Sequence, residues 1–168
     1  MTTEDPFVLL GLERRFDLDA RTLRAAWMRR IATAHPDAEG GAAEAARLNA
    51  AQRELADPLS RAGLLLRLGG APATDERELP AGFLVEMMEL REAADEAEGD
   101  AARREALAAD ARARRAAARA EIAAAFAGAS APIDADAARR VRVGMNVVRS
   151  FDRMLEQLER ERGGEAAR

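Results

Sequence analysis

The feature that most constrains this chain is its shortage of strand-forming residues. Aromatic residues make up 4% of the chain, tyrosine is absent and few residues are β-branched. Alanine accounts for about a quarter of the residues and arginine is the main basic residue, and both are strong helix formers. No segment shows the alternation of apolar and polar residues that marks a half-buried strand. The sequence therefore predicts an all-α fold.

Three counts exclude most kinds of catalytic and metal chemistry. The chain has no cysteine, which rules out disulfides, thiolate metal sites and thiol nucleophiles. Its single histidine makes a histidine metal site or a Ser-His-Asp triad hard to assemble. The net charge is −4, and nucleic-acid binding usually needs a basic excess. We therefore expect no catalytic residues, no metal, no cofactor and no nucleic-acid partner.

The start of the sequence has no long apolar segment. Its longest apolar run spans residues 7–10, which is too short for a signal-peptide core or a membrane span. We therefore expect a cytoplasmic protein that does not bind membranes.

Caps and breakers divide the chain into helices. Asp5-Pro6 and Asp57-Pro58 each place a capping carboxylate before a proline at the first helical position. Glycines mark the expected ends of several helices. The expected helices span residues 6–10, 20–34, 42–56, 58–68, 80–98, 100–127 and 134–162.

Composition also suggests where the chain divides. Residues 71–79 are mostly polar and include one proline, so they form the expected linker. We expect residues 1–70 to form a first domain that ends in a junction helix. Residues 80–168 are expected to form a C-terminal three-helix bundle, because short connections between long helices favour antiparallel packing.

The segment 101–125 consists almost entirely of alanine, arginine and acidic residues. It has few large apolar side chains, so its packing is weakly specified and it is expected to form a solvated spacer helix. Its arginines alternate with acidic residues and no aromatic side chain is available for stacking on bases. A helix face with many ion pairs is therefore a better interpretation than a nucleic-acid-binding strip.

The tripeptide His35-Pro36-Asp37 follows an amphipathic helix with a basic outer face. Pro36 ends that helix and holds a rigid turn, so His35 and Asp37 project as preorganised polar groups at low entropic cost. The basic residues of the preceding helix are Arg21, Arg24 and Arg29.

This arrangement resembles a J-domain, the module that activates chaperones of the DnaK or HscA type. The resemblance implies that the tripeptide and the three arginines bind the nucleotide-binding domain of such a chaperone and stimulate its ATP hydrolysis. The alternative is that the tripeptide is an accident of sequence in an ordinary loop.

Further segments resemble one family of J-domain proteins, the HscB-type co-chaperones of iron–sulfur cluster assembly. These segments are LN at 48–49, DPLSRA at 57–62, LLLRLG at 64–69 and FLVEMMELRE at 83–92. The resemblance implies that the C-terminal domain binds the scaffold protein of the IscU type on which clusters are built. It also implies that the J-domain brings this scaffold to the chaperone, which aids cluster transfer.

The expected helix at 80–98 has two different faces. One face is an ordinary core stripe, which consists of Phe83, Met87, Leu90, Ala94 and Ala97. The opposite face carries Val85, Met88, Glu89, Glu92 and Glu96. Folding does not require Val85 and Met88 on that side, so an apolar pair with acidic neighbours is a plausible partner surface. The alternative is that a second layer of the bundle covers it.

The family resemblance favours the partner surface and adds Leu84, which lies between the two faces. The sequence thus predicts a two-domain co-chaperone that is not itself an enzyme. Two rival hypotheses remain open. The chain could be a J-domain protein for a different client, or a purely structural helical adaptor in which the tripeptide has no role.

Overall fold

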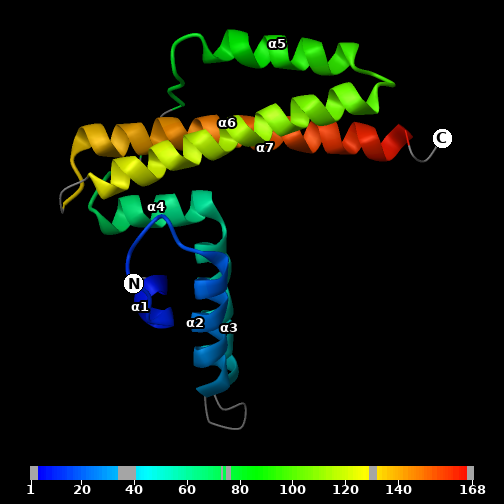
Figure 1. Ribbon diagram of the computed structural model, residues 1–168. Coiled ribbons are helices and arrows are strands. Elements are labelled where there is room, and N and C mark those ends of the chain that lie inside the picture. The colour runs from blue at the N-terminus through cyan, green and yellow to red at the C-terminus, as the bar shows by residue number, and fades with distance from the viewer. Residues whose placement is uncertain (1–3, 34–40, 73, 75–76, 129–131, 166–168) are drawn as a thin grey trace. The chain divides into compact units, whose positions relative to one another are not determined.

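The computed structural model describes residues 4–33, 41–72, 74, 77–128 and 132–165, with side chains described as far as residue 160. These residues form seven helices and no strand, so the all-α prediction is confirmed. The chain divides into two compact units, Met1–Pro72 and Ala73–Arg168. Each unit has its own hydrophobic core. Figure 1 shows the helices of both units.

The first unit contains four helices: α1 (Pro6–Leu10), α2 (Ala20–Thr33), α3 (Gly41–Ala56) and α4 (Pro58–Leu68). The predicted caps are present, because the Asp5 carboxylate accepts a hydrogen bond from Phe7 N and the Asp57 carboxylate accepts one from Ser60 N. The core of this unit brings together Phe7, Leu10, Leu23, Ala26, Leu48, Ala51, Leu55 and Leu64.

Two side-chain hydrogen bonds hold α2 against its neighbours. Trp27 Nε1 donates to Asn49 Oδ1 of α3 at 3.0 Å. Arg30 Nε donates to the carbonyl oxygen of Leu9 in α1 at 2.8 Å. Because these bonds fix α2 on both sides, the exposed face of α2 is held by a rigid support.

Arg61 of α4 joins the loop before α2 to the junction of α3 and α4. The Arg61 side chain is buried, its Nη1 donates to the carbonyl oxygen of Leu55, and its guanidinium carbon lies 5.4 Å from the centre of the Phe16 ring. The guanidinium thus satisfies a carbonyl near the end of α3 and covers an aromatic ring.

We expect Arg61→Leu to lower the free energy of unfolding of the first unit by about 2 kcal/mol, because a charged hydrogen bond and a cation–π contact are lost together. Arg67→Leu on the same helix is the control, because Arg67 is exposed and forms a surface ion pair with Glu54. Urea unfolding measures both variants. Equal losses would show that Arg61 contributes no more than a surface arginine.

The second unit consists of α5 (Phe83–Glu96), α6 (Ala101–Ala127) and α7 (Ala135–Glu165). The expected helix at 80–98 is wrong at its start: Gly82 has a left-handed φ of +79°, so the chain turns there and α5 begins at Phe83. The core includes Phe83, Met87, Leu90, Ala94, Ala108, Ala111, Phe151, Met154, Leu155 and Leu158.

The prediction that α6 is a solvated spacer is wrong for one of its faces. Arg104, Ala108, Ala111, Ala118, Ile122 and Ala125 are buried, and α6 packs along α7. The helices come so close that a Cβ atom at Gly144 would lie 2.6 Å from Ile122 Cγ1. The small alanine side chains of α6 can therefore fill the core here, because α7 has a glycine, Gly144, at the contact.

The ion-pair interpretation of α6 is confirmed. Arg112 pairs with Glu105 at 2.9 Å, and Arg114 pairs with Asp110 at 2.8 Å. Arg115 reaches Asp152 of α7 at 2.8 Å. Arg112, Arg114 and Arg115 of α6 thus form ion pairs with carboxylates of the second unit.

Candidate partner-binding surfaces

The exposed face of α2 is basic. Arg21, Arg24 and Arg29 are all exposed, and none of them pairs with a carboxylate in the part of the chain that the structure describes. Met28, which is 51% exposed, lies on the same face. The face thus combines free positive charge with one large apolar side chain, which suits an acidic partner surface.

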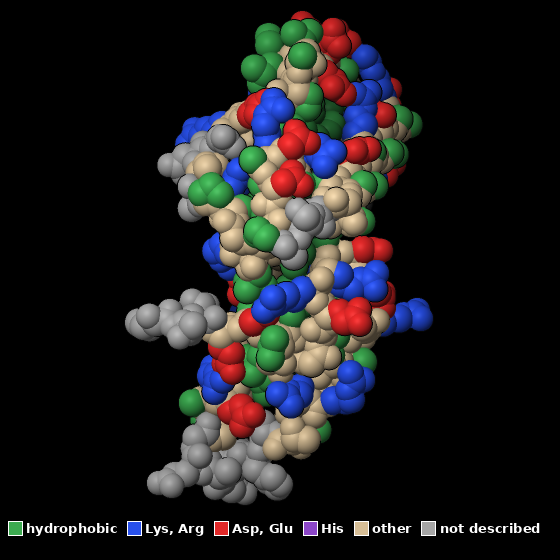
Figure 2. Space-filling view, turned by 90° about the vertical axis from the view of Figure 1, so that its left-hand side faces the viewer, with side chains coloured by type: hydrophobic (Ala, Val, Ile, Leu, Met, Phe, Trp, Pro, Cys, Tyr) green, Lys and Arg blue, Asp and Glu red, His purple; other side chains and the backbone are tan. Residues whose placement is uncertain are grey.

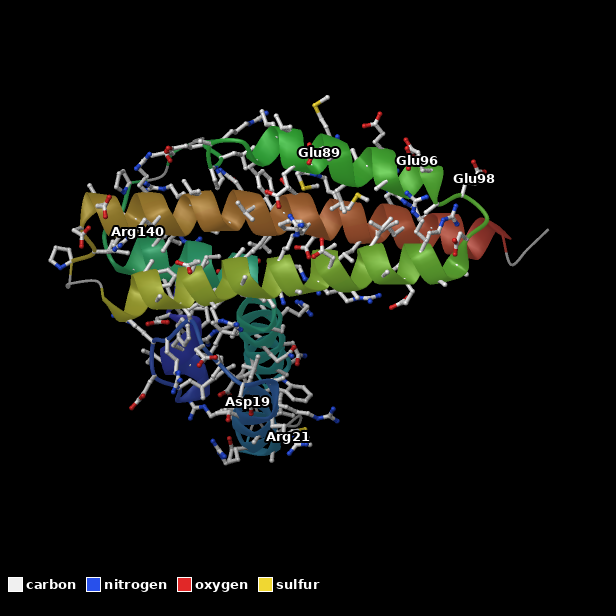
Figure 3. All side chains as sticks on the ribbon, turned by 45° about the horizontal axis from the view of Figure 1, so that its top comes forward. Asp19, Arg21, Glu89, Glu96, Glu98 and Arg140 are labelled. Atoms are coloured by element: carbon white, nitrogen blue, oxygen red, sulfur yellow. The ribbon has the colours of Figure 1, made fainter. Side chains whose placement is uncertain are left out.

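The Asp19 carboxylate caps the start of α2 and accepts a hydrogen bond from Thr22 N at 2.9 Å. This backbone hydrogen bond lowers the pKa of Asp19 below its usual value. Figure 3 labels Asp19 and Arg21 at this end of the helix. The cap therefore stays charged near neutral pH and fixes the helix turn that carries Arg21.

The predicted tripeptide His35-Pro36-Asp37 lies outside the described residues. The structure describes the chain on both sides of it, since α2 ends at Thr33 and α3 begins at Gly41. In the sequence, the tripeptide therefore lies between the residues of these two helices and begins two positions after Thr33.

On α5 the predicted division into two faces is present. Phe83, Met87 and Leu90 are between 4% and 8% exposed. The Phe83 ring meets the Phe151 ring edge-on, with centroids 5.7 Å apart. This contact with α7 fixes the rotation of α5 about its axis, and hence the direction of its outer face.

Three large apolar side chains of α5 remain outside this core. Leu84 is 66% exposed, Val85 60% and Met88 67%. Glu89, Glu92 and Glu96 are exposed beside them. We call these six residues the α5 patch. Figure 2 shows hydrophobic side chains beside acidic ones at its upper end, over α5, and Figure 3 labels Glu89 and Glu96 on this helix.

One member of the α5 patch has a partner that the sequence did not indicate. The Glu96 carboxylate pairs with Arg103 of α6 at 2.8 Å. The two residues lie on either side of the turn between α5 and α6, so the pair closes that turn. Glu96 is therefore partly neutralised within the chain, whereas Glu89 and Glu92 have no ion pair among the described side chains.

A groove that sequence reasoning missed lies between the start of α5, α6 and α7. Its volume is about 1030 Å³, and its lining includes Phe83, Ala118, Val143 and Gly144. The small side chains of α6 and α7 leave this space open, and such a space depends on tertiary packing. Two ion pairs, Glu86 with Arg114 and Glu78 with Arg139, stand among its lining residues.

Neither metal ligands nor a membrane helix is present in the described part of the chain. No group of three His, Cys, Asp or Glu side chains there is arranged to hold a metal ion. No described helix is both long enough and apolar enough to cross a membrane.

The family model and the curated proteins that match this chain are all described as HscB. The family described as "HSCB C-terminal oligomerisation domain" matches residues 79–159. A co-chaperone protein HscB homolog from Bordetella pertussis is 40% identical over 121 residues, which cover 66% of this chain and 71% of the relative. A homolog from Chromobacterium violaceum is 38% identical over 115 residues, and the match spans 66% of that relative's length.

Two solved structures of similar proteins match nearly the whole length of this chain. The chaperone HscB from Vibrio cholerae matches with a TM-score of 0.77 and 25% identity, over 96% of this chain and 99% of that one. Human co-chaperone protein HscB matches with a TM-score of 0.79 and 24% identity, over 96% and 84% of the two chains. The similarity to these structures therefore includes both units.

Proposed function

This chain belongs to the HscB family of co-chaperones, and on that basis we propose that it stimulates ATP hydrolysis by a DnaK- or HscA-type chaperone and delivers an iron–sulfur scaffold protein of the IscU type to it. The observation that carries the proposal is the exposure of Leu84, Val85 and Met88 on a helix whose other face is fully packed.

The α5 patch has the chemistry of a protein-binding surface. Its apolar centre gains free energy when a partner removes it from water, and the unbranched Met88 side chain can adapt to the partner's shape. Glu89 and Glu92 stand beside that centre without ion pairs among the described residues. We therefore propose a scaffold surface that offers apolar side chains surrounded by basic ones.

The first unit is proposed to bind the chaperone. The arginines of α2 have no ion pair among the described residues and would attract an acidic surface on the chaperone's nucleotide-binding domain. His35, Pro36 and Asp37 follow α2 in the sequence. Asp37 offers a carboxylate for an arginine of the partner. The hydrolysis of ATP takes place in the chaperone, so this chain acts as an activator and not as an enzyme.

Titration of the purified chain with an IscU-type scaffold in a calorimeter tests the proposal. We expect a saturable complex of one scaffold per chain. A rival hypothesis, a J-domain protein for another client, predicts no heat with the scaffold but stimulation of the chaperone. The other rival, a structural adaptor, predicts neither effect.

Reversing two charges on α2 should slow binding to the chaperone. We expect Arg24→Glu/Arg29→Glu to lower the association rate by about tenfold at low ionic strength, because the basic face no longer attracts the acidic partner. Added salt should reduce the wild-type rate and narrow the difference between the two proteins. Stopped-flow fluorescence measures both rates.

Arg103→Glu/Arg112→Glu, which changes the same amount of charge on α6, is the control for this experiment. Its association rate should stay close to that of the wild type. Equal slowing by both double variants would mean that only net charge matters and that the α2 face has no specific role.

A further inference from the structure

The outer face of α2 carries a short pattern of charged and apolar side chains. Arg21, Arg24 and Met28 are all exposed. Because they are three and then four residues apart, they lie on one side of the helix. We call these three residues the α2 stripe. From the start of α2 onwards, it presents two positive charges and then one large apolar side chain.

The two arginines of the α2 stripe lie in the first two turns of the helix. A helix rises about 1.5 Å per residue, so about 14 Å separates Arg24 from Thr33, the last residue of α2. The carboxylate closest in sequence, that of Asp19, accepts hydrogen bonds from the backbone N–H and the hydroxyl of Thr22. Neither Arg21 nor Arg24 has an ion pair among the described residues. Both charges are therefore available to a partner.

The α5 patch carries the complementary pattern in the opposite order. Val85, Glu89 and Glu92 are exposed and are four and then three residues apart, so they also share one side of their helix. Met88 stands exposed beside Val85. From the end of α5 towards its start, the patch presents two negative charges and then large apolar side chains. Its spacing is thus the reverse of the spacing in the α2 stripe.

We propose that the α5 patch of one copy of this chain binds the α2 stripe of a second copy, with the two helices antiparallel. One register brings opposite charges together and apolar side chains together along the whole contact. The facing residues in this register are Val85 with Met28, Glu89 with Arg24, and Glu92 with Arg21. Association removes large apolar groups from water on both helices, and the two charge pairs fix the register and the direction.

The contact joins two different surfaces and is therefore heterologous. One copy still exposes its own α2 stripe and the other its own α5 patch, so association can continue beyond two copies. These surfaces are also the ones proposed above to bind the chaperone and the scaffold. Either partner should therefore compete with self-association. This competition rests on the proposed function, whereas the self-association does not.

Sedimentation velocity of the full chain, with neither partner present, tests the proposal. We expect the average sedimentation coefficient to rise with protein concentration, and to rise less when salt is added. Arg21→Glu/Arg24→Glu and Glu89→Arg/Glu92→Arg should each weaken association by at least about tenfold, because the facing charges then repel each other. A thermal melt of each variant checks that it is folded.

An equimolar mixture of these two variants should associate again. The unchanged α5 patch of the first variant can then bind the unchanged α2 stripe of the second. Arg149→Glu/Arg153→Glu is the control, because it changes the same amount of charge at two exposed positions of α7 outside both surfaces. It should associate as the wild type does.

Four results would overturn the proposal. The first is a chain that stays monomeric at every concentration. The second is association that survives Arg21→Glu/Arg24→Glu, since the second unit would then associate by itself. The third is equal weakening by the control, and the fourth is a mixture that associates no better than its components. Because no chaperone or scaffold is present, each of these results leaves the calorimetric test of the proposed function unaffected.

Discussion

Replacing Val85 and Met88 by alanine together should weaken binding of an IscU-type scaffold by about 2 kcal/mol or more, which is more than tenfold in affinity. Both side chains are mostly exposed in the chain by itself, at 60% and 67%. A partner that covers them would remove large apolar groups from water at the centre of the α5 patch. Isothermal titration calorimetry with the purified scaffold measures the loss.

The same double variant should keep its fold. Neither side chain belongs to the core of the second unit, and alanine has a higher helix propensity than valine. We therefore expect a melting temperature close to that of the wild type.

Met87→Ala and Leu90→Ala on the same helix are the matched controls. Met87 is 4% exposed and Leu90 is 8% exposed, and both pack in the core of the second unit. Each truncation should lower the free energy of unfolding by about 2–5 kcal/mol. If Val85→Ala/Met88→Ala lowered the melting temperature as much as these controls do, the α5 patch would be part of the folding core. The scaffold would then have to bind elsewhere.

Replacing His35 by glutamine or Asp37 by asparagine should remove most of the stimulation of the chaperone's ATPase. Each change keeps the approximate size of the side chain but removes the imidazole or the charge with which the partner would interact. The sequence predicts an exposed turn at the tripeptide, where substitutions usually change stability by about 0.5 kcal/mol or less, so the helical content and the melting temperature should stay nearly constant. Steady-state phosphate release measures the stimulation.

Glu39→Gln provides a control within the same connection between α2 and α3. It removes one charge at a position that the resemblance to J-domains gives no role, so stimulation should be unchanged. Full stimulation by either His35→Gln or Asp37→Asn would show that the tripeptide is not the activating element, and the hypothesis of an accidental sequence would stand.

Local signals in the sequence were sufficient for most helix boundaries. Asp5, Asp57, Asp100 and Asp134 each accept a hydrogen bond from a backbone N–H in the first turn of the following helix. Such caps depend only on residues within a few positions of each other, which is why they can be predicted. The two faces of α5 were also predictable, because their spacing follows the helical period.

Features that depend on contacts between distant residues were not predictable in this way. The packing of α6 depends on Gly144 of α7, which lets the two helices approach, and alanine alone does not indicate a buried face. The pairing of Glu96 with Arg103 depends on the geometry of the turn between α5 and α6. The groove lined by Phe83, Ala118, Val143 and Gly144 forms only when the second unit is folded.

The most direct test of the proposed function is the steady-state rate of ATP hydrolysis by a DnaK- or HscA-type chaperone, measured with and without this chain. The account predicts that saturating amounts of the chain raise the rate several-fold. It also predicts that an IscU-type scaffold raises the rate further when Val85 and Met88 are intact, but not in Val85→Ala/Met88→Ala. A rate of hydrolysis that the folded chain leaves unchanged, with scaffold or without it, would contradict the proposed function.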